Sequence, residues 1–298
     1  MTGNSLTPIL SPKGAREQEG RALECGDERI EVSQTNDQFI ATQGGNLRVR
    51  VEGPQDAPAL VFSNSLGTTF EMWDAQAAKF SKDFRVVRYD TRGHGGSVVS
   101  PGAYSFDLLG SDVVAILDAL KIERAHFCGI SMGGFTGLWL GLNAASRMNS
   151  IAVCNSAAKI GTPDGWNTRS AMVREKGVAA MKELADSSPS RWFTEAFITA
   201  QPAVVQRAQA WIAAVNPQGY AGCCDALAGA DVRDQLAKIA VPTLIIAGSA
   251  DPVTTVADGE FMQQHIPGAK LAAVPASHLS NLEAPQAFDD ALSQFLRA

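Results

Sequence analysis

The pentapeptide Gly129–Gly133, which has the form G-x-S-x-G, constrains the fold more than any other stretch of this 298-residue chain. An apolar run precedes it, and a helical pattern of small residues follows from Phe135 to Ala145. A strand, a tight turn and a helix in this order form a nucleophile elbow, where small residues around a strained serine let strand and helix approach. The Ser131 hydroxyl then stands at a strand tip, at the positive end of a helix dipole. An ordinary glycine-rich turn has the same letters, so a catalytic Ser131 requires an acid and a histidine later in the chain.

Strand-like and helix-like segments alternate on both sides of the elbow. Besides the run before the elbow, strands are expected at Phe39–Thr42, Leu47–Val51, Ala59–Phe62, Arg85–Tyr89, Ser150–Cys154, Pro242–Gly248 and Lys270–Val274. Helical spacing predicts helices near residues 70–80, 107–120, 258–264 and 285–296. The first two strands flank Gly44-Gly45-Asn46 and predict a β-hairpin. This alternation predicts the α/β class, with a mostly parallel central sheet, helices on both faces and ligands at the carboxyl ends of the strands.

Two segments depart from the alternation and predict the domain organisation. Residues 157–231 contain helix-like segments and aromatic residues but no good strand, which predicts a helical cap inserted into the sheet domain. The core is then residues 38–156 together with 232–298. Residues 1–37 are polar and charged and contain Pro8 and Pro12, so we expect a poorly ordered N-terminal extension.

One aspartate and one histidine follow the elbow at the positions a catalytic triad needs. Asp251 comes directly after the strand that ends at Gly248, and His278 lies between the last strand and the last helix. Asp251 precedes Pro252, so it could also do no more than open a turn. Ser131, Asp251 and His278 nevertheless stand in the order that this type of triad requires, all at the same sheet edge.

The other three histidines have simpler interpretations. His265 falls in an expected surface helix and is interpreted as solvated. His126 lies in the elbow strand, where we expect it to be in the core or hydrogen-bonded. His94 precedes Ser131 in the chain, and we expect it to brace a loop near the site.

The three candidate side chains define a chemistry. His278 Nε2 takes the proton of Ser131 and returns it to the leaving group, while Asp251 fixes the histidine tautomer and stabilises the imidazolium. The tetrahedral oxyanion needs two N–H donors. We assign them to the backbone of Met132, the residue after the nucleophile, and of Leu66, in the loop after the Ala59–Phe62 strand.

Composition limits the partners and the compartment. The net charge is −6 and the pI is near 5.3, which argues against nucleic acid or an anionic membrane as the main partner. No apolar run reaches membrane-spanning length, and the first residues show no secretory signal pattern. The five cysteines form no C-x-x-C pair, and adjacent Cys223 and Cys224 are expected to pack rather than pair. We therefore expect free thiols and a cytoplasmic location.

Several longer segments carry a more specific resemblance. They are Phe62–Thr68, Tyr89–Gly95, Cys128–Gly134, Asn155–Ile160, Arg191–Thr194, Gly219–Cys224 and Ser277–Asn281. Together with the triad, they resemble the α/β-hydrolase superfamily and, within it, the 3-oxoadipate enol-lactonases, from about Gln38 to the C-terminus. The resemblance implies the α/β-hydrolase fold with an inserted cap. It also implies hydrolysis of 3-oxoadipate enol-lactone to 3-oxoadipate in the β-ketoadipate pathway of aromatic catabolism, without a metal or another cofactor.

The implied substrate carries a carboxylate, which a basic side chain of the cap would bind. The candidates are Arg191, Lys159 and Arg169, and at least two of the three are expected to be solvated instead. Arg191 is favoured because it lies among aromatic residues. Trp166 is a candidate pocket wall, and Ser65 in the Asn-Ser-Leu-Gly loop is a further candidate contact. Trp139, on the elbow helix, is expected to pack in the core instead. The sequence assigns no oligomeric state.

Four other functions remain open. The same triad would serve a general carboxylesterase, a cofactor-free perhydrolase or a carbon–carbon bond hydrolase. A dehalogenase is disfavoured, because its nucleophile would be an aspartate in place of Ser131. A non-catalytic ligand-binding protein could also use a hydrolase pocket, although an intact triad argues against it.

Overall fold

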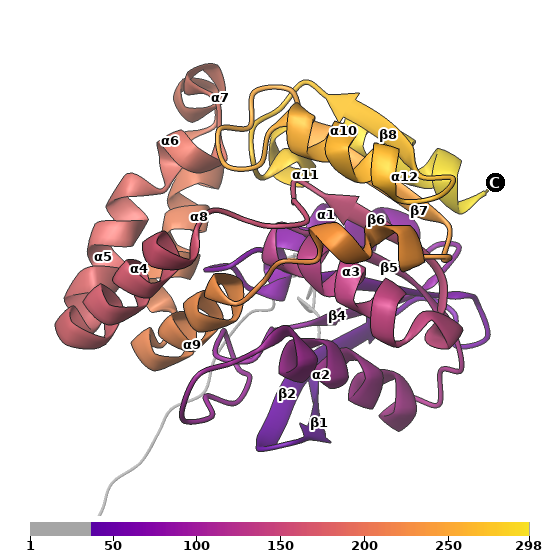
Figure 1. Cartoon of the computed structure of the whole chain (residues 1–298), viewed down its shortest axis with the longest axis horizontal. Helices are drawn as coiled ribbons and strands as arrows, with labels where there is room; N and C mark the ends of the chain where they lie inside the picture. The colour runs from indigo at the N-terminus through magenta and orange to yellow at the C-terminus, as the bar shows by residue number, and fades with distance from the viewer. Residues whose placement is uncertain (1–36, 298) are drawn as a thin grey trace, which may run out of the picture. The chain divides into compact units, whose positions relative to one another are not determined.

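The computed structural model describes residues 37–297, and its centre is an eight-stranded sheet in the order β1-β2-β4-β3-β5-β6-β7-β8 (Figure 1). The strands are β1 (Asp37–Thr42), β2 (Gly45–Glu52), β3 (Ala59–Ser63), β4 (Arg85–Tyr89), β5 (Ala125–Ile130), β6 (Met148–Cys154), β7 (Thr243–Gly248) and β8 (Lys270–Val274). The pairs β1–β2 and β2–β4 are antiparallel, and the strands from β4 to β8 pair in parallel. The prediction of a mostly parallel sheet is confirmed.

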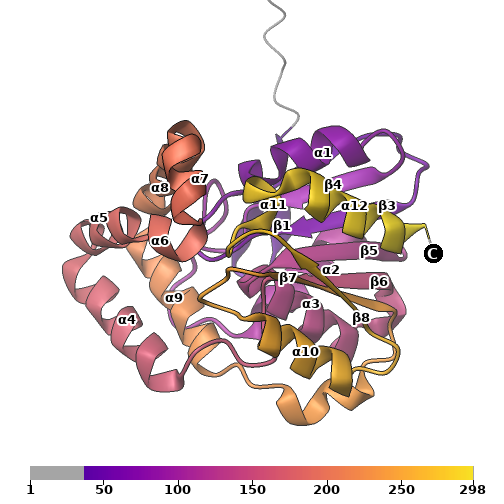
Figure 2. The ribbon, with the colours of Figure 1, turned by 90° about the horizontal axis from the view of Figure 1, so that it is seen from above.

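Helices cover both faces of this sheet. In Figures 1 and 2, α2, α3 and α10 lie on one face, and α1 and α12 lie on the other. The helices of this part are η1 (Phe70–Trp73), α1 (Asp74–Phe80), α2 (Phe106–Ala119), α3 (Met132–Asn143), η2 (Ala145–Arg147), η3 (Arg233–Lys238), α10 (Val256–His265), α11 (Ser280–Glu283) and α12 (Pro285–Leu296). Within residues 37–297, no helix combines the length and the apolar character that crossing a membrane requires.

A group of helices is inserted between β6 and β7. They are α4 (Pro163–Lys176), α5 (Val178–Ser187), α6 (Pro189–Trp192), α7 (Glu195–Ala200), α8 (Pro202–Ala214) and α9 (Pro217–Ala228). Both views place them together on one side of the sheet, and we call them the cap (Figures 1 and 2). The inserted helical cap is confirmed, whereas the boundaries at 157 and 231 stay predictions. The predicted extension 1–37 lies outside the described residues except for Asp37, which begins β1.

The differences from the expected elements are small and have local causes. The helix expected from residue 70 begins as the 3₁₀ turn η1, where the Phe70 N–H donates to Asp90 Oδ1 at 2.9 Å. The strand β6 begins earlier than expected because Met148 pairs with Ala125 ahead of an irregularity in register. The sequence alone does not reveal this pairing. The helix α2 begins where the Ser105 hydroxyl accepts the N–H of Leu108.

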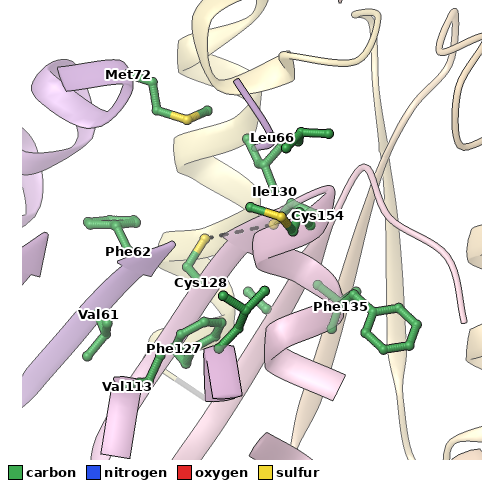
Figure 3. Close-up of a cluster of buried hydrophobic side chains, with 14 of the residues drawn as sticks. Val61, Phe62, Leu66, Met72, Val113, Phe127, Cys128, Ile130, Phe135 and Cys154 are labelled. Atoms are coloured by element: carbon green, nitrogen blue, oxygen red, sulfur yellow. Dashed lines mark hydrogen bonds between the residues drawn. The ribbon is translucent and has the colours of Figure 1, made fainter. Parts of the chain in front are cut away.

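Apolar side chains from neighbouring strands form the core beneath the elbow. Figure 3 shows side chains from β3, β5 and α3 meeting around Cys128 on β5 and Cys154 on β6, whose sulfur atoms are 3.8 Å apart. Burial raises the pKa of the Cys128 thiol well above its usual value, which keeps it neutral. Cys223 and Cys224 are also buried free thiols, as predicted, and Cys25 lies outside the described residues.

Candidate active site

Ser131 occupies a strained turn between β5 and α3. Its φ is 57° and its ψ is −114°, a conformation that an L-residue rarely adopts. A Cβ at Gly129 would lie 2.2 Å from the carbonyl oxygen of Gly133, and one at Gly133 would lie 2.4 Å from that of Ser63. Only glycine fits either position, so the backbone has the geometry predicted for a nucleophile elbow.

His278 and Asp251 come together at the edge of the sheet where Ser131 lies. Asp251 follows β7 and His278 follows β8, and His278 Nδ1 is 2.8 Å from Asp251 Oδ2. Ser131 and His278 line the same cavity. The described part of the structure has no hydrogen bond between these two side chains. Such a bond is often long before substrate binds, so the arrangement fits a triad in its resting state.

The Asp251 carboxylate accepts several hydrogen bonds besides the one from His278. Its Oδ1 accepts the N–H groups of Val253 (2.8 Å) and Thr254 (3.1 Å), and its Oδ2 accepts the Thr254 hydroxyl (2.9 Å). Burial alone would raise the pKa of Asp251, but the hydrogen bond and charge of His278 and the other donors outweigh burial and lower it. The carboxylate is therefore ionised at neutral pH and holds the Nδ1 proton of His278.

Asn155 is a site residue that the sequence analysis did not single out. It follows β6 with a φ of 41°, and its Nδ2 donates to Asp251 Oδ2 (3.0 Å) and to the carbonyl of Ser277 (3.1 Å). Its Oδ1 accepts the hydroxyl of Ser280. One amide therefore ties together the loops that carry the acid and the histidine. Its place at a strand end, between the elbow and β7, was the available signal.

The loop after β3 is fixed directly to the elbow. The carbonyl of Asn64 accepts the Gly133 N–H at 3.1 Å, while its side chain donates to the Tyr89 carbonyl and accepts from Trp73 Nε1. Leu66, two residues on, lines the cavity. Met132 is the first residue of α3, so its N–H has no partner within the helix. The assignment of these two N–H groups to the oxyanion stays a prediction.

The cavity beside Ser131 has a volume of about 140 Å³ and is lined by residues of both the core and the cap. All three predicted substrate contacts, Ser65, Trp166 and Arg191, line it. Larger hollows lie elsewhere on the described surface, such as one of about 390 Å³ near α2 and α3, but they do not contain the triad residues. The chemistry of the lining, rather than the volume, therefore identifies the site.

Two arginines give this cavity a positive charge. Arg169 and Arg191 both line it, no acidic side chain does, and neither arginine makes an ion pair within the described residues. Of the three candidate anchors in the cap, Arg191 and Arg169 line the cavity, whereas Lys159 lies off it and pairs with Asp231 at 3.3 Å. Burial and the neighbouring charge of Arg169 lower the pKa of Arg191. A bound carboxylate would relieve this repulsion.

Comparison with known proteins agrees with this geometry. The family model described as "alpha/beta hydrolase fold" matches residues 58–285. The chain belongs to the α/β-hydrolase family. It is 53% identical to 3-oxoadipate enol-lactonase 1 of Acinetobacter baylyi over 86% of this chain and 95% of the relative. It is 49% identical to 3-oxoadipate enol-lactonase 2 of the same organism, over 87% and 96%.

A solved structure extends the likeness to three dimensions. The crystal structure of the enol-lactonase from Burkholderia xenovorans LB400 is 41% identical and has a TM-score of 0.85, covering 88% of this chain and all of that one (100%). The predicted resemblance to the 3-oxoadipate enol-lactonases is confirmed. Across the described part of this α/β-hydrolase, no three His, Cys, Asp or Glu side chains gather where they could hold a metal ion.

The remaining histidines have the structural roles expected for them. His94 is buried, its Nε2 accepts the Gly67 N–H at 2.9 Å, and it braces the loop that carries Leu66. His126 lies 2.8 Å from the Ser150 hydroxyl, and His265 is exposed. Trp139 packs away from the cavity, as expected, and donates to Asp107 at 2.6 Å.

His94 should make the stability of this α/β-hydrolase fall in acid. Burial lowers the pKa of His94 to about 4 from an ordinary value of 6.5, so the unfolded chain binds a proton before the folded protein does. The neutral state of His94 therefore contributes fully to the free energy of unfolding above pH 6.5. This contribution, about 3 kcal/mol in total, is lost as the pH falls toward 4. His94→Gln keeps an acceptor but does not titrate.

Urea unfolding at several pH values between 7 and 4 measures this difference. We expect the free energy of unfolding of the wild type to fall more steeply with acid than that of His94→Gln. Parallel curves for the two proteins would show that His94 does not stay neutral in the folded state.

Proposed function

We propose that this protein hydrolyses 3-oxoadipate enol-lactone to 3-oxoadipate, a step of the β-ketoadipate pathway of aromatic catabolism. The observation that carries the proposal is the cavity that Ser131 and His278 share with Arg169 and Arg191, two arginines that make no ion pair within residues 37–297. Its volume of about 140 Å³ lies below the roughly 300–1,000 Å³ of sites for drug-sized ligands, which favours a small substrate. Two relatives named for this activity, about half identical in sequence, support it.

The first half of the reaction forms an ester with the enzyme. Arg191 and Arg169 bind the free carboxylate of the lactone and direct its ring carbonyl toward Ser131. Ser131 Oγ attacks the carbonyl carbon while His278 Nε2 takes the hydroxyl proton. The N–H groups of Leu66 and Met132 stabilise the oxyanion that forms.

Collapse of this intermediate breaks the ring C–O bond. The leaving oxygen is an enol, which is more acidic than an ordinary alcohol, and it takes the proton from His278. The enol then tautomerises to a ketone, which suppresses the reverse reaction. A water molecule, deprotonated by His278, hydrolyses the ester at Ser131 and releases 3-oxoadipate. The residues described here supply every proton transfer, so the proposed reaction uses no metal or other cofactor.

A spectrophotometric assay with freshly generated enol-lactone tests the function. A simple p-nitrophenyl ester serves as the comparison substrate. Turnover of the ester without turnover of the lactone would favour a general carboxylesterase or perhydrolase. Binding of the lactone without turnover of either substrate would favour a non-catalytic binding protein.

Arg191→Leu should raise KM for the lactone by about 10- to 100-fold, because a charge-assisted hydrogen bond to the carboxylate is lost. The p-nitrophenyl ester has no carboxylate, so its KM should change by less than about threefold. Arg207→Leu is the matched control, since Arg207 is an exposed cap arginine that stacks on Trp211 outside the cavity. Equal effects on lactone and ester would eliminate Arg191 as the carboxylate partner.

The cysteines and the net charge support a compartment and a class of partner. Four described cysteines are free thiols, which supports a location in the reducing cytoplasm. The net charge of −6 supports a small-molecule partner rather than nucleic acid or an anionic membrane.

A further inference from the structure

The loop that carries His278 is tied to one short segment of the cap. The N–H of Leu279, directly after His278, donates to the carbonyl of Trp192 at 3.1 Å. The N–H of Ser277, directly before His278, donates to Glu283 Oε2 at 2.7 Å. The other carboxylate oxygen of Glu283 accepts both the N–H (3.1 Å) and the hydroxyl of Thr194. Both neighbours of His278 are thereby fixed to residues 192–194.

The same cap segment begins at the substrate anchor. Arg191 and Trp192 line the cavity and end the short helix α6, and Thr194 follows two residues later. Glu283 makes no ion pair within the described residues. Its carboxylate accepts N–H and O–H donors instead, and these come from the histidine loop and from the cap. This arrangement needs two acceptor oxygens on one side chain.

We propose that Glu283 is a positioning residue for the reaction, which holds the His278 loop in register with cap segment 191–194. It touches no reacting atom and acts through His278. The proposal rests on the proposed function, because it links the general base to the segment that binds the substrate carboxylate. A displacement of the general base by about 1 Å can lower the rate by about 100-fold, so such a link has a measurable effect.

Two variants remove the link in different ways. Glu283→Gln keeps the shape but places an NH₂ group opposite Ser277 N–H or Thr194 N–H, and one side of the link is lost. Thr194→Val removes only the hydroxyl, while Thr194→Ser retains it and also retains the hydroxyl that caps α7. Thr194→Ser is therefore the conservative rescue, and Thr194→Val tests the proposal even if Glu283→Gln folds poorly.

The first readout does not depend on the lactone. Diisopropyl fluorophosphate is neutral and reacts with an activated serine, so its rate of reaction with Ser131 reports the placement of His278. We expect Glu283→Gln and Thr194→Val to lower this rate by about 10- to 100-fold, and the double variant to lose no more than Glu283→Gln alone. Thr194→Ser should react like the wild type.

The second readout separates kcat from KM with the enol-lactone. Arg191 donates to the Ser187 hydroxyl and the Leu184 carbonyl, so its placement does not depend on Glu283. The loss should therefore appear in kcat, with KM changed by less than about threefold.

Four results would overturn the proposal. They are unchanged phosphorylation rates, losses that multiply in the double variant, a Thr194→Ser variant as slow as Thr194→Val, and an effect confined to KM. A wild type that reacts with the fluorophosphate but not with the lactone would contradict the proposed function alone, and Glu283 would still be judged on the phosphorylation rates. A wild type that fails to react with the fluorophosphate would refute Ser131 as the nucleophile and the role of Glu283 with it.

Discussion

Ser131→Ala should lower kcat for the enol-lactone by about 10⁶-fold, the largest effect expected from any single change in this protein. Alanine removes the hydroxyl that would form the covalent ester, and water must then attack the lactone directly. The residual rate reflects binding and the oxyanion donors, which do not depend on the hydroxyl. The measurement is the rate constant of a single turnover with the enzyme in excess, compared with that of the wild type.

Ser150→Ala is the matched control for this experiment. Ser131 and Ser150 are both 7% exposed, but Ser150 lies at the start of β6, where it contacts His126. Its loss should leave kcat within about twofold of the wild type. A Ser131→Ala variant that retains a tenth or more of the wild-type kcat would rule out the covalent mechanism.

The positions of Ser131, Asp251 and His278 at one edge of the sheet were predictable from the sequence because each obeys a local rule. The elbow has glycines where a Cβ would collide with backbone, and the structure shows those collisions at Gly129 and Gly133. Asp251 and His278 directly follow strands whose apolar runs are easily recognised. Since parallel strands end at one edge of the sheet, strand order alone brings these side chains together.

Asn155 and Glu283 could not be predicted in the same way. Asn155 bonds to Asp251 and to Ser277, which lie 96 and 122 positions away in the chain. Glu283 contacts Thr194 across 89 positions. Their roles arise only when separate loops meet, and no periodic pattern in the sequence records such a meeting.

The spacing of Arg169 from Trp166 in the sequence indicates that both side chains line the cavity. It lies three residues after Trp166 on α4, and its guanidinium carbon is 5.0 Å from the centre of the Trp166 ring. Residues three apart share one face of a helix. If Trp166 lines the pocket, Arg169 should line it too, and the cavity contains both.

Asp251→Asn should lower kcat by about 10⁴-fold, because an amide can hold the wrong tautomer of His278. It should also lower the free energy of unfolding by about 2 kcal/mol, since a buried donor then lacks an acceptor. Both carboxylate oxygens accept donors: Oδ1 from the N–H groups of Val253 and Thr254, and Oδ2 from His278 and the Asn155 amide, among others. Either orientation of the asparagine amide therefore places an NH₂ group against these donors.

Asp289→Asn is the matched control, because it removes a buried carboxylate that does not contact His278. Asp251 and Asp289 are both 6% exposed, but Asp289 lies on α12 and contacts Gln76 and Lys79 instead of the triad. We expect Asp289→Asn to keep kcat within about twofold of the wild type. If Asp251→Asn lost less than about tenfold in kcat, the imidazolium of His278 would not depend on Asp251, and the triad assignment would be wrong. Steady-state kinetics and urea unfolding of both variants decide between these outcomes.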